Sequence, residues 1–445
     1  MKLTLLIFTV FLFGYNAANA QWTVKHLEEN FDNTGTVKFK NDSLGLFMGY
    51  GSTILKTTDI GETWNKIQIT SDINIEDFQF IGDSCVIAIG DHYPSNGENI
   101  TSKLIKSKNL GENWDSISTL TGKQLYSLWF FNNDSGFVAG YDGIYRTVNS
   151  ASSWDTVWSV TQFGYEFGEV RQIFFPSSDI GYAIGVGWNQ SSNPSLEDFL
   201  LKSTDSGVTW DTIKTFRNSS LASMFFVNQD LGFIGTGIGR LFKTTDAGNT
   251  WDEKQISNSG NDIKSIQFLS ETKGFATGGT TDYPTSGGGS NFFISKTIDG
   301  GENWTSYDTT GIALNSIYFI NDTTGFVSGD NELIMKSNGQ INKLPENYPW
   351  YLIKGMDVDE IKLQNSNIKI YPNPTSGILY IQCINSNKKV EKINLINASG
   401  QMVNIGKIDT NNQVIRLNLS DLTSGIYLLK VEYPEHTETM KIIKK

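Results

Sequence analysis

One eight-residue pattern recurs along most of this chain of 445 residues. It places Ser or Thr first, Asp third, Gly fifth and Trp last, with small departures in the weaker copies. Six segments carry the pattern: Thr57–Trp64, Ser107–Trp114, Thr147–Trp154, Ser203–Trp210, Thr244–Trp251 and Thr297–Trp304. Self-similarity of this kind indicates an array of one supersecondary unit, which constrains the fold more than any other feature of the sequence.

Each copy sits inside a longer unit. Upstream of it lies a short apolar run ending in Phe, then a second apolar run that begins after Gly; the second unit carries Val86 where the others carry Gly. The terminal Phe residues number seven: Phe39, Phe80, Phe130, Phe175, Phe226, Phe268 and Phe319. Each unit reads as four short strands, the fourth beginning at Trp. We therefore expect an all-β fold, a seven-bladed β-propeller.

The pattern itself predicts a turn between the third and fourth strands. Its Asp accepts backbone N–H bonds, its Gly takes a positive φ, and its Trp is buried between neighbouring sheets. These structural roles are assigned to Asp59, Gly61, Trp64, Trp114, Trp154, Asp205, Gly207, Trp210, Asp246, Gly248, Trp251, Asp299, Gly301 and Trp304. A basic residue precedes every copy, Arg146 in the third unit and Lys in the others, and we expect its stem to cover apolar surface.

The seventh unit is truncated. It ends at Lys336–Gly339 without a Trp, whereas Trp22-Thr23-Val24 near the N-terminus resembles the start of other fourth strands, such as Trp210–Ile213. We predict that this N-terminal segment supplies the fourth strand of the last blade. Closure of the ring would remove exposed sheet edges.

The pattern resembles the Asp-box (BNR) repeat over roughly Gln21–Gln340. Units such as Gly51–Asp59 are most similar to propellers of the photosystem II assembly factor group, and sortilin-type ectodomains are further single propellers. These relatives bind proteins or peptides, so the resemblance implies a binding module. Sialidases also carry Asp-boxes but need three converging arginines. This propeller has Arg146, Arg171, Arg217 and Arg240, and no Arg-Ile-Pro motif, which disfavours a sialidase. Xyloglucanases cleave between two propellers, and here there is one.

The first twenty residues have the pattern of a secretory signal peptide. Lys2 supplies a positive charge, Leu3–Phe13 is a short apolar run, and Ala18-Asn19-Ala20 is a small-residue site, which predicts cleavage between Ala20 and Gln21. The apolar run is too short to span a bilayer, and we expect no transmembrane segment.

The repeat stops after Gln340. Residues 341–367 are expected to form a linker, and residues 368–445 resemble the type A C-terminal sorting domain of the type IX secretion system. The residues that carry this resemblance are Pro372, Asn373, Pro374, Gly377, Gly400, Gly425 and Tyr427. It implies a small Ig-like β-sandwich, the type IX machinery as partner, and a protein that passes the periplasm to be secreted or held on the outer cell surface. An ordinary accessory sandwich is the alternative.

Composition narrows the chemistry. A net charge of −12 argues against a nucleic-acid ligand. The three His residues are scattered without metal-ligand spacing, and nucleotide-binding fingerprints are absent, so we expect neither metal nor cofactor. Cys85 and Cys383 fall in different parts of the chain, which favours two free thiols.

Units two, four and six are about ten residues longer than the rest, between their second and third strands. Loops on a rigid scaffold commonly carry binding residues. The candidate ligand-binding residues in these insertions are His92, Tyr93, Trp188, Asp198, Asp282 and Tyr283. Their mixture of aromatic and polar side chains suits a glycan or a protein ligand. The alternative is that the insertions are hairpins extended through a two-blade duplication.

We therefore expect a secreted, noncatalytic propeller that binds an extracellular glycan or protein. A glycoside hydrolase is the rival interpretation, and a structural adhesion component is a third. A pair of buried carboxylates outside the turns, on the face that carries the long loops, would favour the hydrolase.

Overall fold

The computed structural model describes residues 22–27, 35–69, 73–93, 99–189, 196–257, 261–280, 291–310 and 312–337, and shorter stretches between 368 and 444. The chain divides into two compact units, Met1–Ile353 and Lys354–Lys445. The expected linker at residues 341–367 lies outside the described residues. No described helix is long and apolar enough to cross a membrane.

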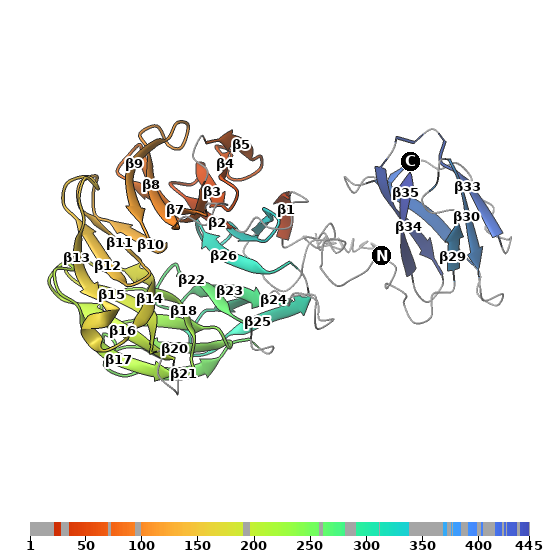
Figure 1. Ribbon diagram of the computed structural model, residues 1–445. Coiled ribbons are helices and arrows are strands. Elements are labelled where there is room, and N and C mark those ends of the chain that lie inside the picture. The colour runs from red at the N-terminus through yellow and green to blue at the C-terminus, as the bar shows by residue number, and fades with distance from the viewer. Residues whose placement is uncertain are drawn as a thin grey trace, which may run out of the picture. The chain divides into compact units, whose positions relative to one another are not determined.

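The first unit is a β-propeller of seven four-stranded antiparallel sheets (Figure 1). Blades 1 to 3 are β2(Gly35–Phe39), β3(Gly45–Gly49), β4(Thr53–Thr57), β5(Asn65–Gln68); β6(Asn74–Ile81), β7(Cys85–His92), β8(Thr101–Ser107), β9(Asp115–Thr121); and β10(Leu125–Phe130), β11(Gly136–Gly140), β12(Gly143–Thr147), β13(Asp155–Ser159). A 3-10 helix, η1(Val160–Phe163), leads into the fourth blade.

Blades 4 to 6 are β14(Phe167–Phe174), β15(Gly181–Trp188), β16(Glu197–Ser203), β17(Asp211–Arg217); β18(Leu221–Phe226), β19(Gly232–Thr236), β20(Arg240–Thr244), β21(Asp252–Gln255); and β22(Ile263–Phe268), β23(Gly274–Thr280), β24(Asn291–Thr297), β25(Thr305–Thr310). The last blade contains β26(Leu314–Phe319), β27(Gly325–Gly329), β28(Ile334–Ser337) and, from the other end of the chain, β1(Trp22–His26).

The N-terminal strand completes the seventh blade. β1 runs antiparallel to β28, with Trp22 opposite Ser337. The Trp22 side chain is fully buried, and its ring meets Phe319 edge-on at a centroid distance of 6.4 Å. Trp22 thus takes the place that the Asp-box Trp occupies in the other blades, as the sequence predicts.

The first strands of the blades form the inner ring of the propeller. Each contacts the first strand of the next blade, and β26 contacts β2, so the ring is closed. Side-chain amides join neighbouring inner strands: Gln79 accepts from Phe130 N at 2.8 Å and donates to Phe130 O at 3.0 Å. Gln267 makes the same two bonds to Phe319, at 2.5 and 3.0 Å. The inner ring is therefore held by polar contacts as well as by packing.

The Asp-box forms the expected turn. Thr63 donates its backbone N–H to Asp59 Oδ1 at 2.9 Å, and Gly61 donates to Thr57 Oγ1 at 2.9 Å with φ +70°. Hydrogen bonds from the Thr63 hydroxyl, the Thr63 backbone N–H and the Thr57 hydroxyl lower the pKa of the exposed Asp59 carboxyl to about 2. The prediction that the fourth strand begins at Trp is wrong by one residue. β5 starts at Asn65, because pairing with β4 begins at that residue, opposite Lys56.

The same turn joins each blade to the one before it. A Cβ on Gly61 of blade 1 would lie 2.3 Å from the Phe326 ring of blade 7. That ring stacks on Phe39 at 4.4 Å, and Trp64 meets Phe39 edge-on at 6.0 Å. Equivalent stacked pairs occur between later blades: Phe137–Phe175, Tyr182–Phe226, Phe233–Phe268 and Phe275–Phe319. At Gly61, Gly207 and Gly301 the Asp-box turn therefore meets an aromatic ring of the preceding blade so closely that only glycine fits, whereas Gly111 faces Leu46 and the third Asp-box has Ala151 at this position.

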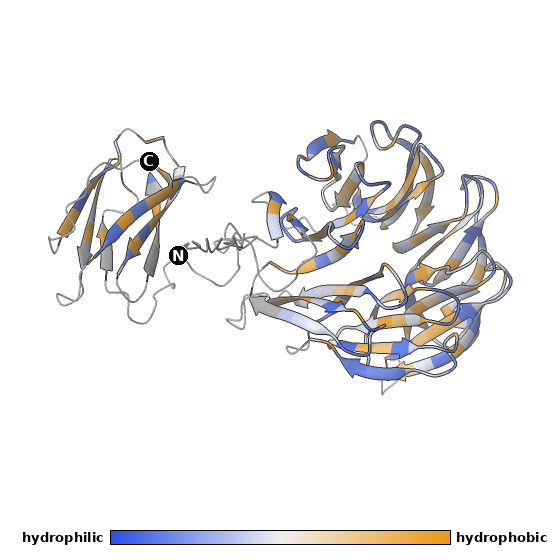
Figure 2. Cartoon of the chain, turned by 180° about the vertical axis from the view of Figure 1, so that it is seen from behind, coloured by the Kyte–Doolittle hydropathy of each residue, from blue (hydrophilic) through white to orange (hydrophobic). Residues whose placement is uncertain are grey.

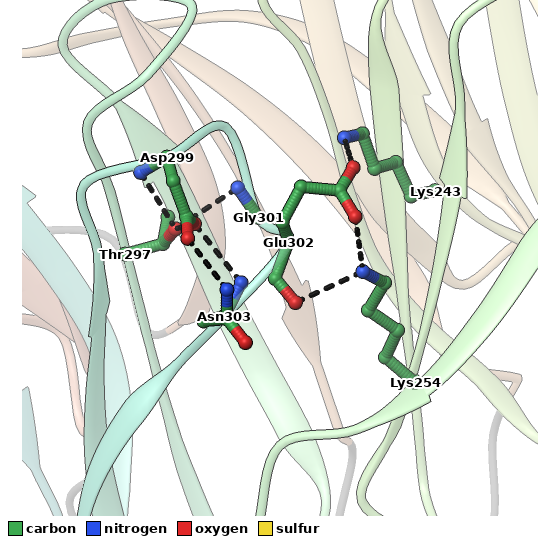
Figure 3. Close-up of polar contacts among 7 residues, drawn as sticks. All are labelled: Lys243, Lys254, Thr297, Asp299, Gly301, Glu302 and Asn303. Carbon is green, nitrogen blue, oxygen red and sulfur yellow. Dashed lines mark hydrogen bonds and ion pairs between the residues drawn. The ribbon is translucent and has the colours of Figure 1, made fainter.

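Ion pairs cross the same interfaces. Glu302, in the Asp-box of blade 6, pairs with Lys243 and, at 2.6 Å, with Lys254 of blade 5 (Figure 3). Both lysines hold the pKa of Glu302 at about 2. Lys243 is one of the basic residues that precede the Asp-boxes, and three others lie over aromatic rings as expected: Lys202 over Tyr182, Lys296 over Phe275 and Lys336 over Phe326. Because the Glu302 side chain is 57% exposed, this contact contributes less than about 1 kcal/mol.

The second unit is a sandwich of a three-stranded and a four-stranded sheet. Its strands are β29(Ile368–Tyr371), β30(Ile378–Cys383), β31(Lys392–Asn397), β32(Met402–Val403), β33(Val414–Asn418), β34(Gly425–Glu432) and β35(Thr437–Lys444). Both sheets supply its core, including Leu379, Leu417, Leu395 and Leu429. Figure 2 shows hydrophobic residues along the strands of both units.

We expect Trp22→Ala to lower the free energy of unfolding by about 3–5 kcal/mol, because it empties a buried space that the blade cannot refill. Removal of residues 21–26 should destabilise the propeller further by leaving β28 unpaired. Chemical denaturation of the full chain measures both effects. Ile298→Ala is the control, since this side chain is 71% exposed and its loss should change stability by less than about 0.5 kcal/mol. An unchanged midpoint for the deletion would contradict ring closure by β1.

A matched pair of glycines separates packing from backbone strain. Gly207 has φ +75° and a Cβ there would lie 2.3 Å from Phe137, whereas Gly122 has φ +72° and nothing within 4 Å. Both Gly→Ala changes should lose about 1–2 kcal/mol to the left-handed backbone. Gly207→Ala should lose about 1–3 kcal/mol more through overpacking. If denaturation shows that both variants lose the same free energy of unfolding, the close packing of Gly207 against Phe137 is contradicted.

Candidate functional site

The antiparallel order of each blade separates two faces of the propeller. The Asp-box turns join the third strand to the fourth at one end of the blade. The hairpin between the second and third strands projects at the other end, next to the start of the first strand, as the pairing of Asn74 with Asp91 shows in blade 2. We call this second side the belt face. Its polar groups take no part in the hydrogen bonds of the Asp-box turns or in their packing against the preceding blade.

Six inner strands carry an irregularity at the same place. In each of these strands the pairing with the second strand skips one residue. In blade 2 the skipped residue lies between Ile75 and Asp77, and in blade 4 it lies between Val170 and Gln172. A bulge of this kind re-aims a side chain and is common beside functional sites. The inserted residues, which we call the inner belt, are Glu76, Tyr126, Arg171, Ala222, Lys264 and Asn315.

Contacts between blades show that the belt residues lie at one level. Lys264 Nζ donates to Asn315 Oδ1 of the next blade at 2.8 Å. Arg171 Nη1 donates to Leu221 O of the next blade at 2.8 Å. Arg171 Nε also pairs with Glu169 at 2.8 Å. The belt therefore runs along the inner strands of blades 2 to 7, and its residues are polar except Ala222.

One part of the belt face is acidic and rich in tyrosine; it contains the belt residues Glu76 and Tyr126 and three neighbouring residues. We call Tyr50, Glu76, Asp91, Tyr93 and Tyr126 the acidic arc. The Tyr50 hydroxyl hydrogen-bonds to Glu76, and the charges of Asp91 and Glu76 both act on Tyr50 and Tyr93. Residues of blades 1, 2 and 3 thus converge here.

The two carboxylates of the arc sit in different surroundings. Asp91 is 1% exposed; its Oδ1 accepts from Ser102 Oγ and from Leu125 N at 3.4 Å, while its Oδ2 has no hydrogen-bond partner among the described residues. Glu76 is partly exposed. Burial, and next the charge of Asp91, raise the pKa of Glu76 to about 7. Glu76 is therefore the group of the arc that both reaches solvent and changes charge near neutral pH.

The basic part of the belt is balanced. Arg171 pairs with Glu169, and the charges of Lys264 and Arg171 both act on Asp262. Asp262 is nevertheless raised in pKa because burial outweighs the two cations. On the belt face, the carboxylates without a basic partner among the described residues are thus those of the acidic arc.

The structure places four of the six residues predicted to bind a ligand. Tyr93 is 48% exposed, and its hydroxyl accepts from Gln124 Nε2 of blade 3 at 3.0 Å. His92, at the end of β7, is half-buried. Trp188 ends β15 and stacks on Phe167 with a centroid distance of 6.2 Å. These three residues lie on the belt face.

Asp198 has a different role from the expected one. It is 3% exposed, and its carboxylate accepts three backbone N–H groups in the connection to blade 5: Ser219 at 3.3 Å, Ser220 at 2.8 Å and Leu221 at 3.1 Å. These bonds occupy the carboxylate, so Asp198 holds the connection rather than facing a ligand. Asp282 and Tyr283 lie outside the described residues.

The sequence did not single out the belt. Glu76 and Lys264 sit in strand-like runs, and Arg171 was considered only in the arginine count. Their shared feature is a one-residue insertion in the first strand, which becomes visible only when the strands are paired. One sequence signal could have indicated the belt. A polar residue recurs one place before a Ser or Gln of the first strand, as in Lys264-Ser265 and Asn315-Ser316.

Other predicted features are only partly described. Ala20, Gln21, Pro372, Asn373, Pro374 and Gly400 lie outside the described residues. Gly377 is buried, Gly425 begins β34, and the Tyr427 hydroxyl donates to Thr423 O at 2.9 Å. Cys85 is half-buried and free. In the described part of the chain, no three His, Cys, Asp or Glu residues are grouped so as to hold a metal ion.

Comparisons with known proteins agree with both units. Residues 369–445 match the family model of the secretion system C-terminal sorting domain. The chain is 23% identical over 315 residues to the photosystem II stability/assembly factor HCF136, chloroplastic, of Arabidopsis thaliana, which covers 67% of this chain and 73% of the plant protein. The C-terminal unit is thus a sorting domain of the type IX secretion system, which marks the chain for export.

Solved structures support the propeller fold. YCF48 from Cyanidioschyzon merolae superimposes with a TM-score of 0.53 at 18% identity, covering 72% of this chain and 99% of its own. A structure of YCF48 bound to D1 peptide gives a TM-score of 0.53 at 17% identity, covering 73% and 98%. At these identities the likeness shows the seven-bladed fold alone.

Glu76→Gln should stabilise the protein at pH 8 by about 2–3 kcal/mol. Because the folded pKa lies above the usual value of 4.5, the proton on Glu76 favours folding at low pH, and this gain is lost as pH rises through about 7. The variant and the parent should therefore differ little at pH 5. Denaturation at both pH values tests this, with the exposed Glu253→Gln as control. Equal stability of Glu76→Gln and the parent at pH 8 would contradict it.

Proposed function

We propose that this chain is an exported, noncatalytic binding protein whose propeller captures an extracellular protein or glycan on its belt face. Residues 1–20 would be a signal peptide, residues 21–340 the binding unit, residues 341–367 a linker and residues 368–445 the sorting domain. The product would be released or retained on the outer cell surface. The observation that carries this proposal is the belt face, where polar and charged side chains of the inner strands lie near the exposed Tyr93 and the partly buried Trp188.

The contrast between the two faces supports this choice. On the opposite face, Asp59, Asp205, Asp246 and Asp299 each bind their own turn, and the Asp-box glycines pack on the preceding blade. Those groups are already used in the fold. On the belt face, Tyr93 remains 48% exposed and Trp188 extends the end of β15. Aromatic side chains so placed can bury a large area against a ligand.

The comparisons favour a polypeptide ligand over a glycan. HCF136 is named as a stability and assembly factor, and YCF48 has been solved with a D1 peptide. Both resemble the propeller of this chain at low identity, so they lend support by analogy of fold. An exported chain would meet a different partner from theirs.

A glycoside hydrolase is the second candidate, and Glu76 is the observation that favours it. A carboxyl with a pKa near 7 suits a general acid. The reaction also needs a second accessible carboxylate. Asp91, its acidic neighbour, is 1% exposed and bonded to Ser102 and Leu125, so it lacks access to substrate. Binding is therefore the better-supported function.

The test is a screen of the full chain against peptide and glycan arrays, followed by variants of each face. The double variant Tyr93→Ala/Trp188→Ala should weaken capture of the ligand about tenfold or more, because each ring contributes roughly 1–3 kcal/mol of burial and stacking. The control is Ile60→Ala/Ile298→Ala on the Asp-box face, where both side chains are exposed. It should change affinity less than twofold.

Two results would contradict the proposal. Loss of binding in the Asp-box-face control, with normal binding in the belt-face variant, would place the ligand on the opposite side. Release of reducing ends from a polysaccharide by the parent, abolished by Glu76→Gln, would establish the hydrolase instead.

A further inference from the structure

No Lys or Arg among the described residues offsets the negative charge of Glu76 and Asp91 in the acidic arc. Burial and the charges of Asp91 and Asp77 act against ionisation of Glu76, and within the described part of the chain no Lys or Arg favours it. Asp77 has its own partner, since Lys38 Nζ lies 2.7 Å from its Oδ1. Asp91 is likewise without a cation among the described residues. A buried charge is ordinarily paired, so the buried Asp91 carboxylate lacks the counter-ion expected for it.

A second observation points the same way. Asp91 Oδ2 is buried and has no hydrogen-bond partner in the described chain, although the other oxygen of the same carboxylate has two. Orphaned buried polar atoms are rare and need an explanation. The charge of Asp91 acts on Tyr50, Glu76, Tyr93 and Tyr126, so it lies within the arc.

The tyrosines of the acidic arc indicate which chemical group of a ligand it could bind. Tyr50, Tyr93 and Tyr126 come from three successive blades, and the charge of Asp91 acts on the hydroxyl group of each. The ring of Tyr93 is the exposed one. Faces of aromatic rings attract cations, and hydroxyl and carboxylate oxygens accept N–H bonds.

We propose that the acidic arc binds the ammonium group of a lysine side chain on a polypeptide partner, with Glu76 as the contacting carboxylate and Asp91 as the buried counter-charge. This names the recognition element of the proposed binding function and rests on it. The ammonium is a compact charge with three donors, which suits converging oxygens better than the planar fork of arginine does. Its four-carbon stem can lie along the exposed Tyr93 ring.

The site should be sensitive to pH. The titratable groups facing Glu76 are Tyr50, Asp77, Asp91 and Tyr93. Lysine keeps its charge between pH 6 and 8, whereas Glu76, with a pKa of about 7, passes from mostly neutral to mostly ionised. The ionised form is the one that binds, so affinity should rise about tenfold over this interval, and binding at pH 7 should release about half a proton.

The test is titration of the full chain with an acetylated, amidated tetralysine peptide in 150 mM salt, followed by calorimetry in two buffers of different ionisation enthalpy. Salt at this concentration screens attraction to the net charge of the protein. Glu76→Gln should weaken binding at pH 8 tenfold or more and remove both the pH dependence and the proton release. Glu253→Gln removes a partly exposed carboxylate elsewhere on the propeller and should change affinity less than twofold.

Parallel titrations with tetra-arginine and with cadaverine test the source of the cation. Weaker binding of both than of tetralysine supports a lysine on a polypeptide, and tighter binding of either overturns that assignment. Equal loss of tetralysine binding in Glu76→Gln and Glu253→Gln would show unspecific charge attraction and overturn the site. If tetralysine fails to bind while Tyr93→Ala/Trp188→Ala still abolishes capture of an array ligand, this inference falls and the proposed function stands.

Discussion

The packing of the Asp-box turn against the apolar core of the preceding blade is the interaction on which the propeller depends. At Gly61 and Gly207 a side chain would collide with Phe326 and Phe137. The turn that positions each glycine is held by its own Ser or Thr and Asp, so local hydrogen bonds fix a contact between blades. One short sequence thereby specifies both the turn and the packing of neighbouring sheets. The last blade is completed from the other end of the chain: β1 pairs with β28, and its Trp22 ring meets Phe319 edge-on.

This construction divides the propeller into two sides with different chemistry. The carboxylates of the Asp-boxes bond within their turns, and Glu302 pairs with two lysines of the preceding blade. Those charges are satisfied by the fold. The belt face has bulged inner strands instead, and there Glu76 and Asp91 remain without a cation among the described residues. Charge left uncompensated on a rigid scaffold is where a ligand gains the most.

Much of the fold could be predicted from the sequence because the repeat encodes its own contacts. The blade count, the turn at Asp59 and the pairing of Trp22–Val24 with the last blade all follow from matching one unit to another. The belt could not be found in this way. Its members lie about fifty residues apart, and a one-residue bulge leaves no trace in the alternation of a short strand. Asp198 was predicted as a ligand residue because an Asp in a loop looks the same whether it bonds three backbone amides or none.

Hydrogen–deuterium exchange of the full chain, followed residue by residue, tests the closed ring most directly. If β1 is an integral strand of blade 7, its amides that pair with β28 should exchange as slowly as those joining the third and fourth strands of blades 4 and 6. Exchange at β1 as fast as in an unfolded peptide, with the other blades protected, would show that the ring is open and would contradict the account.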